Sequence, residues 1–140
     1  MKKIITLAAF LTIIFSSCKK AEIVQEPTCL LSIPNILGTY KITSILYKYN
    51  PQTPEIDYFI YYDECEKDNL LIFNSNNTYV ISEGATACSP TTSESGNWNL
   101  NQSAITIDSE LGTVTDFSCS GMKIKKVYGA EETTIILAKQ

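Results

Sequence analysis

The sequence predicts an all-β protein, most simply a small eight-stranded antiparallel up-and-down β-barrel. About eight short segments are rich in β-branched and aromatic residues, which favour strands. Short connections containing asparagine, glycine or serine separate these segments, and no stretch has a helical period over any length. Eight strands joined by hairpins can close on themselves, which removes exposed edges. A two-sheet β-sandwich is the alternative architecture.

The predicted strands follow one another closely along residues 38–139. Asn74 to Asn77 form the tightest turn, because asparagine tolerates left-handed backbone angles. In the fourth strand Trp98 and Leu100 face one side and asparagines face the other, so Trp98 is expected in the core or at the lining of a cavity. The predicted strands are residues 38–47, 68–74, 78–82, 95–100, 104–108, 113–119, 122–128 and 133–139.

An aromatic loop at residues 50–64 interrupts this pattern. Pro51 and Pro54 cannot donate hydrogen bonds to a strand ladder, which indicates a loop. At a barrel mouth its aromatic side chains would close over a ligand or form a binding surface for a sugar or a protein. Alternatively, they plug the end of the barrel or pack as an extra strand. The aromatic residues concerned are Tyr58, Phe59, Tyr61 and Tyr62.

Residues 1–17 have the pattern of a secretory signal peptide. Two lysines follow the initial methionine, and the apolar stretch after them ends at Phe15. This stretch is too short to cross a bilayer core of about 30 Å at about 1.5 Å per residue. Two serines and Cys18 come next and resemble the lipobox of bacterial lipoproteins, in which the cysteine is lipidated. We expect a lipidated Cys18, a tether over residues 18–35 ending in a short helical turn, and a folded domain over 36–140.

Lipidation of Cys18 would anchor the protein to a membrane, which is therefore its first expected partner. Lys19 and Lys20 follow the cysteine, and no aspartate stands there. By resemblance to enterobacterial sorting, this favours the outer membrane, facing either the periplasm or the outside. The expected location is the cell envelope.

The remaining cysteines are four, an even number. Because the envelope is oxidising, we expect two disulfides, for which three pairings exist. We favour Cys65–Cys88 with Cys29–Cys119, since Cys65 precedes the second strand and Cys88 follows the third, at the open end of one hairpin. A zinc site is the alternative, but the sequence has no CxxC pair and no histidine.

The composition argues against several classes of function. The net charge is −4 and there is no arginine, so we expect no nucleic-acid partner. The absence of histidine removes the commonest general base and metal ligand. The acidic residues around Cys65 match no calcium loop, and no GxSxG nucleophile motif is present. We predict no catalytic residues, no metal and no cofactor, and hence a protein that is not an enzyme.

Four short motifs together resemble the lipocalin-like domain family of Bacteroidetes-type bacterial lipoproteins, over about residues 36–139. Tyr40 departs from the lipocalin pattern, in which tryptophan is usual at this place. The resemblance implies a small barrel whose interior can hold a ligand. The motifs are Gly38-x-Tyr40, Cys65-x-x-Asp68-Asn69, Asn76-Asn77-x-Tyr79 and Ser95-Gly96-x-Trp98-x-Leu100.

Two hypotheses for function follow. In the first, a lipid-anchored envelope protein binds a small hydrophobic ligand inside the barrel. In the second, the barrel is solid, and the aromatic loop is the contact surface of a structural or interaction module that binds another envelope protein. The residues expected to contact the ligand or partner are Tyr58, Phe59, Tyr61, Tyr62 and Trp98.

Overall fold

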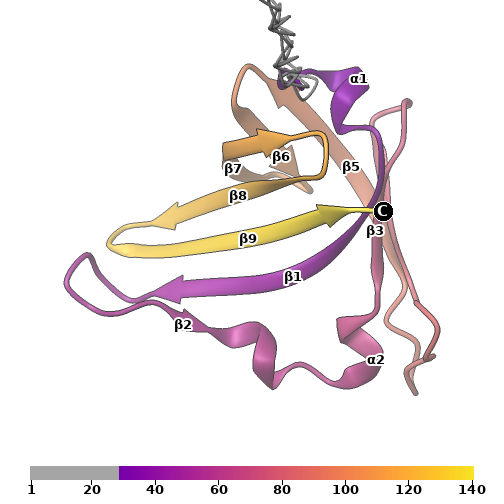
Figure 1. Ribbon diagram of the computed structural model, residues 1–140, viewed down its shortest axis with the longest axis horizontal. Coiled ribbons are helices and arrows are strands. Elements are labelled where there is room, and N and C mark those ends of the chain that lie inside the picture. Colours follow the sequence, from indigo (N-terminus) through magenta and orange to yellow (C-terminus); the bar gives the residue numbers. More distant parts are fainter. Residues whose placement is uncertain (1–28) are drawn as a thin grey trace, which may run out of the picture.

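The computed structural model describes residues 29–140 and shows a closed antiparallel β-barrel with one additional short strand (Figure 1). Consecutive strands pair from β3 to β9, and β1 pairs with both β3 and β9, which closes the barrel. The predicted up-and-down barrel is therefore confirmed, in place of the alternative sandwich. Its strands are β1 (Gly38–Lys48), β3 (Leu70–Phe73), β4 (Thr78–Ser82), β5 (Glu94–Asn101), β6 (Ala104–Ile107), β7 (Glu110–Ser118), β8 (Gly121–Tyr128) and β9 (Glu131–Lys139).

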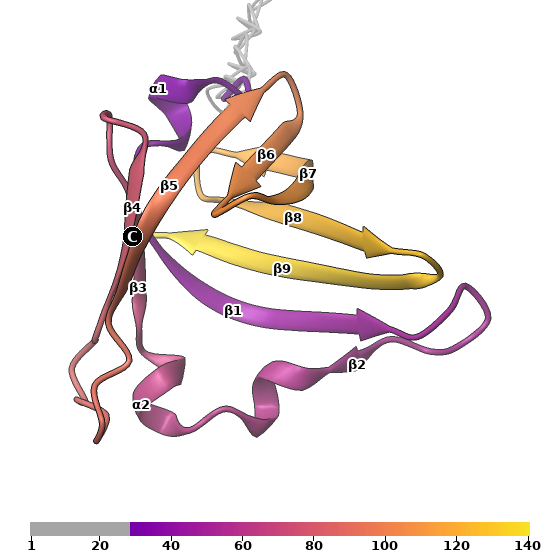
Figure 2. The same ribbon diagram turned by 180° about the vertical axis from the view of Figure 1, so that it is seen from behind.

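Strand β1 changes its neighbour halfway along one edge. Residues 38–41 pair with β3, whereas Leu46 and Tyr47 pair with the additional strand β2 (Ile56–Asp57). On its other edge β1 follows β9 along nearly its whole length, with a register shift between Ile42 and Ser44. Figures 1 and 2 both show β1 and β3 diverging beyond their shared segment. The barrel wall therefore opens beside the middle of β1.

The end of the barrel at which β1 begins is packed. The short helix α1 (Ile33–Ile36), with proline in its first turn, places the fully buried Ile36 over this end. Lys139 joins α1 to the barrel, because its Nζ donates to the Asn35 carbonyl (2.7 Å) and lies 5.5 Å from the centre of the Tyr40 ring. The core cluster comprises Ile36, Tyr40, Phe73, Tyr79, Trp98, Ile105, Val114, Met122, Ile124 and Leu137.

The aromatic loop is more ordered than its sequence predicts. After β2 it forms a single turn of 3-10 helix, η1 (Tyr58–Tyr61), and then the short helix α2 (Glu64–Lys67). The Glu66 carboxylate accepts a hydrogen bond from the Asp63 backbone N–H (3.0 Å), which is half of a capping box. Because α2 ends at Lys67 with Asp68 as its C-cap, the second barrel strand begins at Leu70 and not at residue 68.

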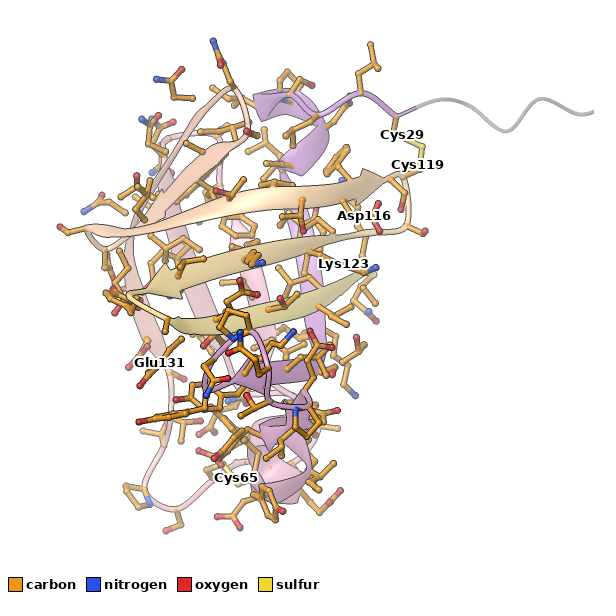
Figure 3. The ribbon with its side chains drawn as sticks, turned by 90° about the vertical axis from the view of Figure 1, so that its left-hand side faces the viewer. Cys29, Cys65, Asp116, Cys119, Lys123 and Glu131 are labelled. Carbon is orange, nitrogen blue, oxygen red and sulfur yellow. A yellow bond between two sulfur atoms is a disulfide. The ribbon has the colours of Figure 1, made fainter. Side chains whose placement is uncertain are left out.

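The two disulfides lie at opposite ends of the barrel (Figure 3). Cys29 is bonded to Cys119 and Cys65 to Cys88, with Cα–Cα distances of 5.2 and 5.3 Å. This is the pairing that the hairpin argument favours. In residues 29–140 no helix is long and apolar enough to cross a membrane. The expected signal peptide and Cys18 lie outside the described residues.

Candidate functional site

A cavity of about 540 Å³ occupies the open end of the barrel. Its size lies within the range of about 300–1,000 Å³ that is usual for small-molecule sites. The cavity is surrounded by the middle of β1, where the edge toward β3 is unpaired, by the stretch from η1 to the start of β3, and by the end of β4 with the connection to β5. The lining residues are Ile42, Ile45, Phe59, Tyr62, Glu66, Asn69, Ile81, Thr91, Thr92, Ser93 and Glu94.

One side of this cavity is apolar. Ile42 and Ile45 come from β1 and Ile81 from β4, and Ile42 and Ile81 also pack against the core of the barrel. Phe59 of η1 and the following Tyr62 add two aromatic rings, whose centroids are 5.5 Å apart. Such a surface favours the burial of an alkyl or aromatic group, at about 25 cal/mol per Å² removed from water.

Asp57 fixes η1 against β1. Its carboxylate accepts hydrogen bonds from the Ser44 hydroxyl (2.8 Å) and from the backbone N–H groups of Ile45 (3.1 Å) and Phe59 (3.0 Å). Desolvation acts to raise the pKa of Asp57, but these three bonds outweigh it and hold the pKa below its usual value. The carboxylate thus supplies the pairing that β1 lacks here and places Phe59 at the cavity.

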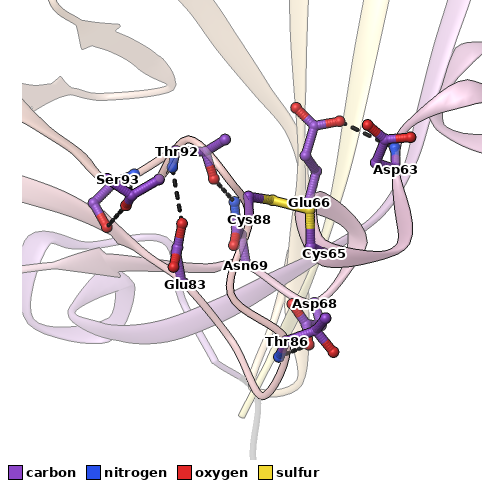
Figure 4. The surroundings of a disulfide bond; sticks show 11 residues. Asp63, Cys65, Glu66, Asp68, Asn69, Glu83, Thr86, Cys88, Thr92 and Ser93 are labelled. Atoms are coloured by element: carbon purple, nitrogen blue, oxygen red, sulfur yellow. Dashed lines mark hydrogen bonds between the residues drawn. A yellow bond between two sulfur atoms is a disulfide. The ribbon is translucent and has the colours of Figure 1, made fainter.

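The other side of the cavity is polar and is joined by the Cys65–Cys88 disulfide (Figure 4). The Asn69 side-chain nitrogen donates to Thr92 Oγ1 (2.9 Å), which links the start of β3 to the β4–β5 connection. The Thr92 backbone N–H donates to Glu83 (2.9 Å), and this bond is the main cause of the lowered pKa of Glu83. The disulfide and these bonds hold two chain segments together as one wall.

The charged groups at the cavity are acidic. Glu66 is half-buried and Glu94 is exposed at the mouth, and no lysine belongs to the lining. The buried Asn69 Oδ1 has no hydrogen-bond partner. Within residues 29–140, no group of three or more acidic or cysteine side chains is placed to hold a metal ion. The arrangement suits recognition of a small molecule with an apolar part and a polar part.

The comparison with family models decides the relationship. A model described as the lipocalin-like domain matches residues 36–126. The chain belongs to the lipocalin-like domain family. No curated protein and no solved structure matches it.

In the lipocalin-like domain, the aromatic residues predicted to contact a ligand or partner fall into two groups: those that line the cavity and those that do not. Phe59 and Tyr62 line the cavity. Tyr58 packs edge-on against Tyr47 (5.3 Å between centroids) at an adjoining hollow that Ile45 and Tyr62 also line, and Tyr61 is 71% exposed. The aromatic loop therefore borders the cavity with Phe59 and Tyr62 and meets solvent with Tyr61. Its extra strand is Ile56–Asp57, whereas the aromatic residues that follow form η1 and not a strand.

Trp98 lies in the core of the lipocalin-like domain and not among the residues lining the cavity. It is 3% exposed, packs edge-on against Phe73 and donates from Nε1 to the Asn74 carbonyl (3.2 Å). This is the core position that the alternation in its strand predicts. Because Trp98 packs against Phe73 and bonds to Asn74, we assign it a structural role.

The polar wall was missed by the sequence prediction, except for its disulfide. The pattern Asp63-x-x-Glu66 could have revealed α2, because it is the signature of a capped helix start. Thr91 to Glu94 carry no comparable signal, since they read as an ordinary polar connection. Their place at the cavity depends on the fold around them.

Proposed function

We propose that this protein is a lipid-anchored cell-envelope protein that binds a small, largely hydrophobic molecule in the cavity at the open end of its barrel. The observation that carries the binding proposal is the cavity of about 540 Å³, with an apolar side of isoleucine and aromatic residues. Membership of the lipocalin-like domain family supports the proposal, because the interior of such a barrel can hold a small ligand. We propose binding and not catalysis, because a cavity of this size with an apolar side suits the burial of a small molecule.

Filling the cavity tests the binding proposal. Ile81→Trp places a larger side chain on the apolar side, so affinity for 1-decanol should fall about tenfold or more while the fold is kept. Isothermal titration calorimetry on the purified protein measures the affinity, and circular dichroism checks the fold. Leu111→Trp is the matched control, because Leu111 is exposed on β7 outside the lining. Absence of decanol binding by the wild-type protein, or equal binding by the Ile81→Trp variant, contradicts the proposal.

The anchoring proposal rests on the signal-like residues 1–17 and Cys18. Cells supplied with radioactive palmitate should incorporate label into the wild-type protein and not into a Cys18→Ser variant. The labelled protein should fractionate with membranes. Equal labelling of the two proteins rules out Cys18 as the lipid attachment site.

A second candidate function is a contact surface for another envelope protein, favoured by the outward face of η1. Ile60 and Tyr61 are exposed there, beside the partly exposed Tyr58. Crosslinking in cells should capture a partner that is lost when Tyr58 and Tyr61 are replaced by serine. If capture is unchanged by these substitutions, this surface is not the contact.

A further inference from the structure

The lining of the cavity is asymmetric in charge, and this bears on the ligand. The apolar side comes from β1, β4 and η1, whereas Glu66 and Glu94 stand on the side formed by α2 and the start of β5. A ligand seated against the isoleucines would therefore present its polar end to two carboxylates.

Neither of these carboxylates has an ion-pair partner within residues 29–140. The ion pairs among residues 29–140 are Lys67–Glu64, Lys123–Asp116, Lys125–Glu132 and Lys126–Glu110, and they involve neither Glu66 nor Glu94. Lys67, the cation on α2 itself, is held by Glu64 at 2.8 Å. The net charge of −4 adds to the negative potential. An anionic ligand would be repelled at this site, and a cationic one attracted.

The aromatic side of the lining also favours a cation. Phe59 and Tyr62 supply two rings at the cavity, and the negative π-face of an aromatic ring attracts an ammonium group within about 6 Å of the ring centre.

We propose that the ligand is a cationic amphiphile: an ammonium group on an alkyl or aromatic body. The body lies against Ile42, Ile45 and Ile81, and the ammonium group lies between Glu66 and Glu94. The inference rests on the proposed binding function and narrows it from hydrophobic molecules in general to amines. It excludes fatty acids as preferred ligands.

Three probes of one chain length separate this inference from the binding function itself. Decylamine, 1-decanol and decanoate are titrated calorimetrically into the purified protein at low ionic strength and below their critical micelle concentrations. We expect decylamine to bind about tenfold tighter than decanol, and decanoate about tenfold weaker than decanol. If decanol binds but decanoate binds as tightly as decylamine or more tightly, the amine preference is overturned and the binding function stands. Failure of all three probes overturns the binding function.

Variants assign the preference to the two carboxylates. Glu66→Gln together with Glu94→Gln should lower the ratio of decylamine affinity to decanol affinity about tenfold. Glu110→Gln removes one negative charge on β7, outside the lining, and should change the decylamine affinity little. A decylamine preference that survives the double substitution, or that falls equally in Glu110→Gln, shows attraction by the whole acidic surface and overturns the assignment.

Discussion

Asp57 is the side chain that holds the aromatic wall of the cavity to the barrel. Its three hydrogen bonds reach Ser44 and Ile45 on β1 and Phe59 on η1. A carboxylate can do this because it accepts several hydrogen bonds at once, which neither a backbone carbonyl nor a neutral hydroxyl does as well. Asp57 thereby supplies hydrogen bonds to β1 where this edge of the strand has no neighbouring barrel strand.

Replacing Asp57 should therefore loosen the wall. We expect Asp57→Ala to lower the free energy of unfolding by about 1–2 kcal/mol, because Ile45 and Phe59 lose their acceptor. Urea denaturation followed by circular dichroism measures this change. Glu55→Ala is the control, since Glu55 is exposed nearby and its replacement should change stability by less than about 0.5 kcal/mol. Equal stabilities of the two variants would refute the role given to Asp57.

At the scale of elements, the two disulfides stabilise different parts of the barrel. Cys65–Cys88 joins α2 to the β4–β5 connection, and both segments supply lining residues to the cavity. Cys29–Cys119 joins the segment before α1 to the turn between β7 and β8, at the packed end. The first bond shapes the candidate site, and the second secures the closed end of the barrel.

Removing each disulfide by paired serine substitutions should separate these roles. Loss of Cys65–Cys88 should cost about 3 kcal/mol in the chain-entropy model and weaken decanol binding severalfold. Cys29–Cys119 closes a longer loop, so its loss should cost about 4.6 kcal/mol, yet leave decanol binding nearly unchanged. Urea denaturation and calorimetry measure the two effects. Equal effects on binding would mean that Cys65–Cys88 has no particular part in the cavity.

The elements that could be predicted from the sequence are those whose pattern is local. Strands β4 to β9 alternate or are rich in β-branched residues, so their existence and order follow from residue types alone. The short elements β2, η1 and α2 could not be found in the same way, because each has only two to four residues and its stability comes from contacts with β1 or from a cap. Phe59 of η1 and Glu66 of α2 line the candidate site, and its threonines and Ser93 lie in the β4–β5 connection, so its polar wall was not predicted.

At the scale of the whole molecule, one end of the barrel is solid and the other is hollow. Sequence alone could not distinguish the two ends, since Ile81 at the cavity and Ile105 in the core are the same residue type in strands of similar pattern. What differs is the neighbour: α1 covers the packed end, whereas β1 and β3 diverge at the open end. Stability can thus be concentrated at one end while the other keeps room for a ligand.

The carboxylates of the whole domain predict how stability depends on pH. Five of them have a pKa below the usual value, each because it accepts hydrogen bonds or pairs with a lysine; they are Asp57, Glu83, Asp108, Glu110 and Glu132. A lowered folded-state pKa gives stability that is present above the unfolded-state pKa and is lost as the pH falls through the folded-state pKa.

With unfolded-state values of 3.8 for Asp and 4.5 for Glu, the loss should begin just below pH 4.5 and continue on further acidification. Urea midpoints recorded at a series of pH values from about 6 down to about 3 should fall steadily across this window. A constant midpoint would show that these hydrogen bonds do not distinguish the folded from the unfolded state.

The pairing of β1 with β9 also governs when the barrel can close. Tyr40 and Lys139 are register partners, although roughly 100 residues separate them, and such distant pairs form late and slowly. A chain made from its N-terminus onward holds the edge of β1 unpaired until the nine residues of β9 have emerged. Until then both edges of the incomplete sheet are templates for strands of other chains. The newly made chain is therefore open to aggregation until β9 has paired with β1, the strand that also lines the cavity.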